Sequence, residues 1–501
     1  MRFRGPLANS YPAAVLLVVF ALIPYLALTS AMTPLMPVLS KSLGLSQQSL
    51  QLTNGMANAA YAFGTVLAVQ FAVHLPARRM LLVYATLSVI SSVLTALAFT
   101  PGFFIAGHIL QGLFTSLMLI AAVPPLVVGW PASKMPWTAG VMNMCIFGAV
   151  ALGPVIGGVQ AGALDWRPLF WIVAGAGAIA LLFVLLTYED QPAQDRSAPW
   201  DFVAIVLAGG GSAAAFFGAS ELETHPMLSS IVFIPLLCGV AMIVTLIVHQ
   251  YSVKRPLMPV RQLATTKPVA GILAAMSAGA ASVAVIELTQ QALKSTTSPI
   301  HGAMLFWPQF GGALMAAMAF ALLVRTRWLV AVVFSGLALL SGGIAILTGV
   351  ATGPHVLVVV GSGLVGLGVG SAVAPALFVA GFSVSSAQIQ RVFALIELLR
   401  AVAAFLAAPI ILHLAMTVDG GSRGAGVNTA MWVCFAIAVG GGLLALYMFI
   451  LGRARLERPN LERWLSGDGP AWQSPPLAAG IRGERSWREA PVRTPDRAAA
   501  R

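Results

Sequence analysis

The sequence predicts an all-α polytopic membrane protein with about fourteen transmembrane helices, and two observations carry this prediction. Apolar stretches of about 20 residues or more, the length a helix needs to cross a hydrocarbon core of about 30 Å, recur almost without pause. Only 9% of the 501 residues are charged. Soluble domains carry about 25%, so this chain has too few charges to cover a water-facing globule.

The first apolar stretch is much longer than a signal-peptide core of about 7 to 15 residues, and we interpret it as a first spanning helix rather than a cleaved leader. Membrane strands run only about 9 to 11 residues, so runs of this length predict helices. The spans are expected near residues 12–39, 50–73, 80–100, 103–129, 138–161, 168–188, 201–221, 228–251, 268–293, 302–324, 328–350, 355–382, 390–416 and 429–451.

The basic residues predict the orientation. An even number of spans places both termini on one side, and about twelve Lys and Arg residues fall on that side against about four on the other: Lys41, Arg167, Lys294 and Arg423. Cytoplasmic loops carry the excess of basic residues. We therefore expect a multi-pass protein of the cytoplasmic membrane with both termini in the cytoplasm, and the formal charge of +12 does not require a nucleic acid partner.

An internal repeat predicts how the helices are grouped. Residues 63–83 align without gaps on residues 310–330, with Phe63 on Phe310 and Arg78 on Arg325. Copies in equivalent orientation indicate parallel repeats about an axis along the membrane normal. We expect an N-terminal six-helix bundle (1–190), a central linker with two extra helices (191–255), a C-terminal six-helix bundle (256–452) and a disordered basic cytoplasmic tail (453–501).

One motif is specific. Residues 148–159 read GAVALGPVIGGV and are followed by DWRPLFWI. Together they resemble the fifth-helix antiporter motif and the start of the sixth helix in the major facilitator superfamily, in its fourteen-helix drug:proton antiporter branch. That resemblance implies two six-helix bundles with an extra central helix pair, and proton-coupled efflux of the multidrug resistance type. Glycines let backbones approach closely and a proline permits a bend; the motif residues are Gly148, Gly153, Pro154, Gly157 and Gly158.

The sequence departs from the family pattern in its hairpin after the second span. Val69 and Val73 stand where the family carries a Gly and an Asp, and only the basic Arg78 and Arg79 match. The fourth span carries His108 where the family usually has an Arg. These departures leave the coupling ion open.

Ionisable side chains at membrane depth are candidates for coupling, because inserting one costs about 2.5 to 3.5 kcal/mol and such groups tend to face a cavity or a partner. Glu397 and Arg400 are three residues apart and share one helical face, so they can pair. Either the pair merely neutralises both charges, or substrate or a proton breaks it during transport.

Glu287, with Gln290 and Gln291 on the same side of its helix, is a second candidate. Low local dielectric disfavours a charged carboxylate, so Glu287 can exchange a proton near neutral pH, or it lies far enough toward the outer end to reach water. His108 is the third, since imidazole titrates closest to physiological pH. The alternative is that His108 only hydrogen-bonds a neighbouring carbonyl.

Amide and aromatic side chains within the spans are expected to line a substrate cavity between the bundles: Asn54, Asn58, Gln111, Asn143, Trp307 and Gln309. No phosphate-binding Gly-Lys-Ser/Thr loop and no paired Cys/His spacing is present. We therefore expect no enzyme activity, no cofactor and no metal. The expected partners are a small-molecule substrate, protons and the lipid bilayer, for a monomeric protein.

The leading hypothesis is a secondary transporter that exports a small apolar or amphipathic compound by alternating access. A proton-coupled importer of organic acids remains an alternative, because fold does not fix function. A transporter-derived sensor that binds ligand without moving it, and more remotely a lipid-modifying membrane enzyme, are hypotheses from other classes.

Overall fold

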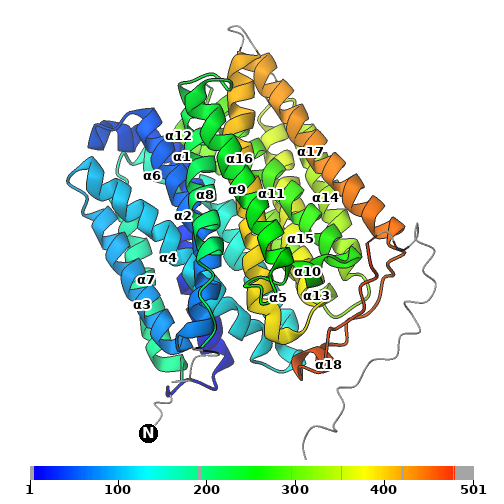
Figure 1. Ribbon diagram of the computed structural model, residues 1–501. Coiled ribbons are helices and arrows are strands. Elements are labelled where there is room, and N and C mark those ends of the chain that lie inside the picture. The colour runs from blue at the N-terminus through cyan, green and yellow to red at the C-terminus, as the bar shows by residue number, and fades with distance from the viewer. Residues whose placement is uncertain are drawn as a thin grey trace, which may run out of the picture.

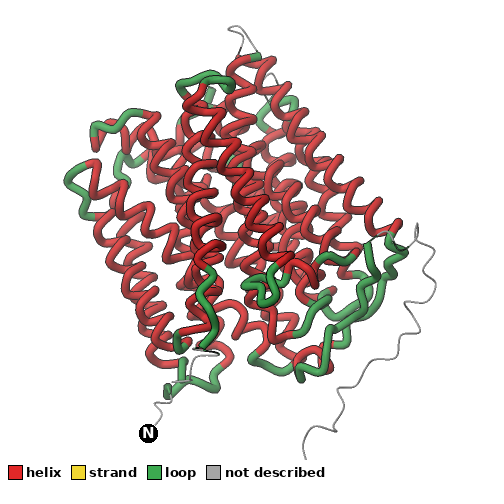
Figure 2. Tube along the Cα trace, viewed as in Figure 1, coloured by secondary structure: helices red, strands yellow, loops and turns green. Residues whose placement is uncertain are grey.

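In a computed structural model, the chain forms a bundle that contains 14 helices long and apolar enough to cross a membrane (Figure 1). The structure describes residues 5–189, 195, 197–294, 296–350, 353–418, 423–477 and 479. Within this part of the chain, Figure 2 shows helices joined by short loops and no strand. The predicted all-α fold is confirmed, and each of the fourteen spans expected from the sequence overlaps one of these helices.

The first half of the chain supplies six spans. They are α1 (Tyr11–Leu43), α2 (Gln47–His74), α3 (Ala77–Ala96), α4 (Pro101–Val128), a composite fifth span and α7 (Arg167–Thr187). The fifth span starts at η1 (Ala132–Lys134) and continues through α5 (Met135–Asn143), the π-helical turn η2 (Met144–Gly148) and α6 (Ala149–Gly162). A π-helical turn inside an α-helix is uncommon and often marks a functional site.

The second half repeats this number of spans. They are α11 (Thr266–Leu293), α12 (Pro299–Met304) with α13 (Trp307–Leu323), α14 (Leu329–Leu347), α15 (Val356–Gly381), η4 (Ser386–Gln388) with α16 (Ile389–Thr417), and α17 (Arg423–Leu451). Between the halves lie α8 (Phe202–Ser220), η3 (Glu221–Glu223), α9 (Ser230–Ser252) and the short α10 (Val260–Leu263).

Helix neighbours repeat between the two halves. In the first half α1 packs against α6 and α7, α2 against α4, and α3 against α4 and α7. In the second half α11 packs against α16 and α17, α13 against α15, and α14 against α15 and α17. The halves meet where α2 contacts α16, α5 contacts α13 and α6 contacts α12, while α8 lies against α2 and α9. This correspondence agrees with the internal repeat in the sequence.

The bundle has two ends. The terminal face is where α1 begins and α17 ends, and the opposite face is where α1 ends and α2 begins. Figure 1 shows α18 (Leu461–Leu465) at the terminal face, at the bottom of the view.

The segment after α17 differs from the expected disordered tail. Over the described residues 453–477 it packs onto the terminal face, with Trp464 fully buried and Trp472 only 5% exposed. The physical reason is that two large rings in an otherwise arginine-rich segment find an apolar surface at Phe382, just after α15, where both make edge-on ring contacts. The expectation for residues 480–501 lies outside the described residues.

Candidate functional site

A cavity lies between the two halves, at the level of the middle of α1, α2 and α11. It encloses about 90 Å³ and is walled by side chains of both halves, among them Thr33, Asn58, Phe147, Ser282 and Gln309. Phe147 comes from the π-helical turn η2, so this irregularity in the fifth span shapes the cavity wall.

A second cavity of about 150 Å³ continues from the first toward the opposite face. Both cavities are lined by Asn54, Glu287 and Phe405. The second also reaches Gln47 at the start of α2 and Lys294 just after α11, which lie at the opposite face. The central cavity is therefore accessible from the opposite face through the second cavity.

Buried amide oxygens face the central cavity without partners. The side-chain oxygens of Asn54, Gln290 and Gln309 are buried and have no hydrogen-bond partner among the described residues. All three residues line the central cavity. Because buried polar atoms in proteins are nearly always hydrogen-bonded, these three acceptors fit a ligand or water that carries N–H or O–H donors.

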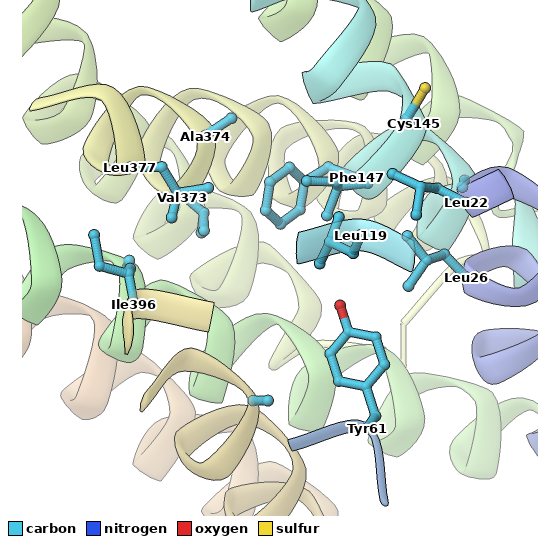
Figure 3. Packing of buried hydrophobic residues seen from close by; sticks show 14 of the residues in the cluster. Leu22, Leu26, Tyr61, Leu119, Cys145, Phe147, Val373, Ala374, Leu377 and Ile396 are labelled. Carbon is cyan, nitrogen blue, oxygen red and sulfur yellow. The ribbon is translucent and has the colours of Figure 1, made fainter. Parts of the chain in front are cut away.

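Apolar side chains of both halves pack together on the side of this cavity that is nearer the terminal face. Figure 3 shows side chains from α1, α2, α4 and η2 on one side of the boundary and side chains from α15 and α16 on the other. We call this cluster the apolar seal; its members are Leu22, Leu26, Tyr61, Leu119, Phe147, Val373, Leu377 and Ile396.

Two hydrogen bonds across the boundary between the halves accompany the apolar seal. Asn143 in α5 donates through Nδ2 to the carbonyl of Gly370 in α15 at 3.0 Å, and Gln390 in α16 donates to the carbonyl of Ile120 in α4 at 3.1 Å. The structure thus has a cavity open toward one face and closed toward the other.

A buried ion pair within α16 lies beside the apolar seal. Arg400 Nε donates to Glu397 Oε2 at 3.0 Å, a second Arg400 nitrogen donates to Oε1, and the two residues are 7% and 3% exposed. The pairing predicted from their three-residue spacing is confirmed. Tyr61 in α2 donates to Glu397 Oε1 at 3.0 Å, which links α2 in the first half to α16 in the second.

Glu287 has a different environment. It lines both cavities, and no hydrogen bond to its carboxylate is found among the described residues. Lys294 interacts electrostatically with Glu287 and with Glu223 of η3. Glu287 is therefore a carboxylate that faces the cavity and has a basic group near it but no closed hydrogen-bond network.

The glycines of the antiporter-like motif bring α6 against helices of both halves. A Cβ at Gly157 would lie 2.7 Å from the Cα of Ala31 in α1, and one at Gly158 would lie 2.9 Å from the carbonyl oxygen of Pro299 in α12. Contacts that short do not occur for real Cβ atoms, so these positions require glycine. The close approach expected from the sequence is confirmed here, and Pro154 lies between these helices inside α6.

Three of the expected site residues lie elsewhere. His108 is fully buried inside the first half, where its ring contacts Phe104 and Phe170 and its Nδ1 lies 3.2 Å from Gln111 Oε1. Gln111 in turn donates to Ser92 at 3.0 Å, so neither residue lines the cavity. Trp307 is 47% exposed on the outside of α13. Asn54, Asn58, Glu287, Gln309 and Arg400 do line the central cavity, and Asn143 lies at the boundary between the halves.

The hairpin after α2 is held by the linker that precedes α8. His74 at the end of α2 stacks on Trp200 with ring centroids 4.4 Å apart, and its Nε2 lies 2.9 Å from the carbonyl oxygen of Ala198. Arg78 is half-buried and Arg79 is exposed at the start of α3. The contact with the linker explains how a hairpin without the family's acidic residue is still fixed at the terminal face.

Sequence reasoning missed several residues of the site, and Tyr61 and Glu223 show why. Tyr61 shares a helical face with Asn54 and Asn58, at the i, i+4 and i+7 positions, and this spacing could have identified it. Glu223 lines the second cavity because η3 folds over its mouth. No local sequence signal places a loop between two extra helices over a cavity that other helices form.

The chain matches a family model described as Major Facilitator Superfamily over residues 18–408. Among curated proteins it is 27% identical over 279 residues to the uncharacterized MFS-type transporter YubD of Bacillus subtilis, a match that covers 54% of this chain and 53% of that protein. It is also 27% identical over 176 residues to the lincomycin resistance protein LmrB of Bacillus subtilis, covering 35% and 36% of the two chains. A multidrug resistance protein B homolog of Mycobacterium tuberculosis is 27% identical over 234 residues, covering 44% and 42%. These matches therefore span about half the length of the curated relatives or less.

Solved structures share the fold at low sequence identity. The human organic anion transporter MFSD10 (TETRAN) superposes with a TM-score of 0.60 and 16% identity, over 87% of this chain and 99% of that one. A POT family transporter in complex with 5-aminolevulinic acid gives a TM-score of 0.62 and 14% identity, over 88% and 96% of the two chains. From the family model and this architecture, the chain is a polytopic membrane protein that belongs to the Major Facilitator Superfamily.

Proposed function

We propose that this protein is a secondary active transporter that exports a small apolar or amphipathic compound by alternating access, driven by protons. The observation that carries the proposal is the central cavity, which lies between two similarly arranged halves, opens toward one face and is sealed toward the other. Such a site serves transport when the halves rock about it. In support, several relatives are named for resistance to lincomycin or to multiple drugs.

The cavity lining suggests the substrate class. Phe147, Val369 and Phe405 supply an apolar wall, and the unpartnered amide oxygens of Asn54 and Gln309 accept hydrogen bonds. A compound with a mostly apolar body and one or two N–H or O–H groups satisfies both features, since a few placed polar groups in an apolar pocket fix orientation.

We assign proton coupling to Glu287. Its carboxylate faces both cavities, where proton and substrate can reach it in turn. The Glu397 and Arg400 pair has a different role in this proposal: with Tyr61 it holds α2 against α16 while the terminal face is closed. His108 is not needed for coupling, because it packs among aromatic rings away from the cavity.

The proposal includes a setting in the cell. We place the protein in the cytoplasmic membrane as a monomer, with both termini and the terminal face in the cytoplasm, on the distribution of basic residues. Residues 1–190 and 256–452 would move as two bodies, with α8 and α9 carried on the linkers between them. The cavity described here would then face the cell exterior.

Purified protein in proteoliposomes tests the function. With an inward-directed pH gradient and a panel of fluorescent amphipathic compounds, we expect at least one to move against its concentration gradient and to stop when the gradient is collapsed by an ionophore. If no compound accumulates but some bind, the sensor hypothesis replaces the transporter.

Arg400 favours one competing substrate class. It lines the central cavity, and a cationic group there suits an organic anion. Its charge is already paired with Glu397, which weakens this alternative. The direction of flux decides, because an importer of organic acids would move a labelled acid together with protons rather than against them.

A further inference from the structure

The segment that follows α17 is fixed across the terminal face, and we propose that residues 453–477 form a latch that holds this face closed. The inference goes beyond the transport cycle proposed above and rests on alternating access. Its test measures conformation, not transport, so that its failure and the failure of the proposed function are distinguishable.

The latch is anchored at the loop after α15. The Trp464 ring lies 5.0 Å from the Phe382 ring in an edge-on contact, and its Nε1 donates to the carbonyl of Val384 at 2.9 Å. Trp472 Nε1 donates to Ser383 Oγ at 2.9 Å. The backbone N–H of Ala471 donates to the carbonyl of Phe382 at 2.8 Å, so the latch is held by main-chain and side-chain bonds together.

A second anchor is at the start of α11. The side chain of Lys267 is only 1% exposed, and its Nζ lies 3.0 Å from Glu457 Oε2 and 4.7 Å from the centre of the Trp472 ring. Thr266 N–H donates to the carbonyl of Pro475 at 2.9 Å. A buried ammonium needs a charged partner and is stabilised further by an aromatic ring, and here the latch supplies both. This amount of specific contact is far more than a free tail would show.

The latch also reaches the other half of the molecule. α18, which carries Trp464, has Cα atoms within 8 Å of Cα atoms in η1. η1 opens the fifth span and leads directly into α5, which packs against α13 at the terminal face. Figure 1 shows α18 at the bottom of the bundle, away from the end of α17 where the segment starts.

The contact between α18 and η1 is what allows the latch to favour the closed state of the terminal face over the open one. A segment shifts an equilibrium only through contacts that differ between the two states. The anchors at Phe382 and Lys267 belong to the second half and travel with it, whereas η1 belongs to the first half. Opening the terminal face moves η1 away from α18, so the latch stabilises the closed state and must be released for opening.

A cysteine cross-link measures closure of the terminal face directly. A Cβ at Gly140 in α5 would lie 3.4 Å from the Cβ of Ala321 in α13, close to the separation of about 3.5 to 4.5 Å found in disulfides. The parent for the test carries Gly140→Cys and Ala321→Cys, with Cys145, Cys238 and Cys434 each replaced by Ser. Oxidant is added to the full-length protein in proteoliposomes and the rate of disulfide formation is measured.

We expect Trp464→Ala to slow cross-linking about fivefold or more, the lower end of typical coupling between distant elements. A chain that ends at residue 479 keeps the latch and should cross-link at the parent rate. Equal rates for Trp464→Ala and the parent would overturn the proposal, as would a parent that forms no cross-link.

A second variant tests the latch even if Trp464→Ala fails to fold. A protease recognition sequence inserted after Leu456, which is 40% exposed, allows the latch to be cut in protein that has already folded. Cutting turns the latch into a separate fragment that is then washed away, and its loss should slow cross-linking as the substitution does. Cut protein that has lost the fragment and still cross-links at the uncut rate contradicts the latch. Both results can be read even if the protein transports none of the compounds tried.

Discussion

Glu397 and Glu287 are two glutamates on neighbouring helices, α16 and α11, with opposite surroundings. Glu397 is closed into a network by Arg400 on its own helix and by Tyr61 from the other half. Glu287 faces open space in both cavities, and among the described residues its carboxylate has an electrostatic interaction with Lys294 near the mouth but no hydrogen bond. The comparison teaches that the two carboxylates differ in what surrounds them: Glu397 is held in a closed hydrogen-bond network, whereas Glu287 faces open space.

The largest effect is expected at the closed network. Glu397→Gln leaves the Arg400 charge buried without its partner, which typically costs about 3 to 5 kcal/mol. We expect a marked fall in the thermal unfolding temperature of the protein in detergent. The double variant Glu397→Gln with Arg400→Met removes both charges and should recover most of the loss. A single variant as stable as the parent would mean that the pair is not a structural contact.

Substitution of Glu287 should affect transport rather than stability. Glu287→Gln removes a charge that has no hydrogen-bond network to lose, so the unfolding temperature should not fall. If Glu287 carries the proton, accumulation driven by a pH gradient is lost while exchange of labelled for unlabelled substrate continues. Glu223→Gln, at the exposed mouth, is the matched control and should keep gradient-driven accumulation. Coupled transport by Glu287→Gln would move the coupling role elsewhere.

The sequence predicted the spans and the pairing of Glu397 with Arg400, because both follow from local spacing along a helix. It also placed the close-packing glycines at 157 and 158 correctly. The sequence could not show that the side chain of His108 is buried inside the first half whereas that of Asn54 lines the cavity. A helix that is apolar all round has no polar face to indicate which side chains face lipid, the bundle interior or a cavity. The docked tryptophans of the tail were missed because their partner, Phe382, lies far earlier in the chain, where no local pattern connects the two segments.

Tyr61 gives a finer test of the closed network. Tyr61→Phe keeps the ring in the apolar seal and removes only the hydrogen bond to Glu397. Hydrogen bonds to charged groups contribute about 1.5 to 3 kcal/mol, so we expect a smaller loss of stability than for Glu397→Gln. In a double-mutant cycle with Glu397→Gln, the effect of Tyr61→Phe should shrink toward zero. Additive effects of the two substitutions would show that the hydroxyl acts independently of Glu397.

The smallest effect is expected for a carboxylate outside the spans. Asp201 caps α8 by accepting from the Ala204 N–H at 2.9 Å and also binds Gln250 and His249. Burial alone would raise the pKa of Asp201, but these hydrogen bonds outweigh it and hold the pKa below its ordinary value. Because the pKa of Asp201 is lower in the folded state, the ionised carboxylate stabilises the protein at pH values above its ordinary pKa of about 3.9. This stabilisation is lost as the pH falls through the folded-state pKa.

Asp201→Asn keeps a good cap and removes only the charge. We therefore expect it to lower stability at pH 7 by less than about 1 kcal/mol, and to match the parent once the pH is well below the lowered folded-state pKa of Asp201. Thermal unfolding of both proteins across this pH range checks the sign. A difference that grows at low pH would contradict the assignment.

In the proposed export cycle, substrate enters the cavity from the cytoplasm and leaves toward the opposite face, so the terminal face must open and close in every turnover. The disulfide between Gly140→Cys and Ala321→Cys locks that face shut, and transport through the same proteoliposomes is then measured before and after reduction. We expect oxidation to lower transport at least about tenfold and reduction to restore it, while each single cysteine variant is unaffected. Transport at the full rate by the cross-linked protein would contradict alternating access through this face.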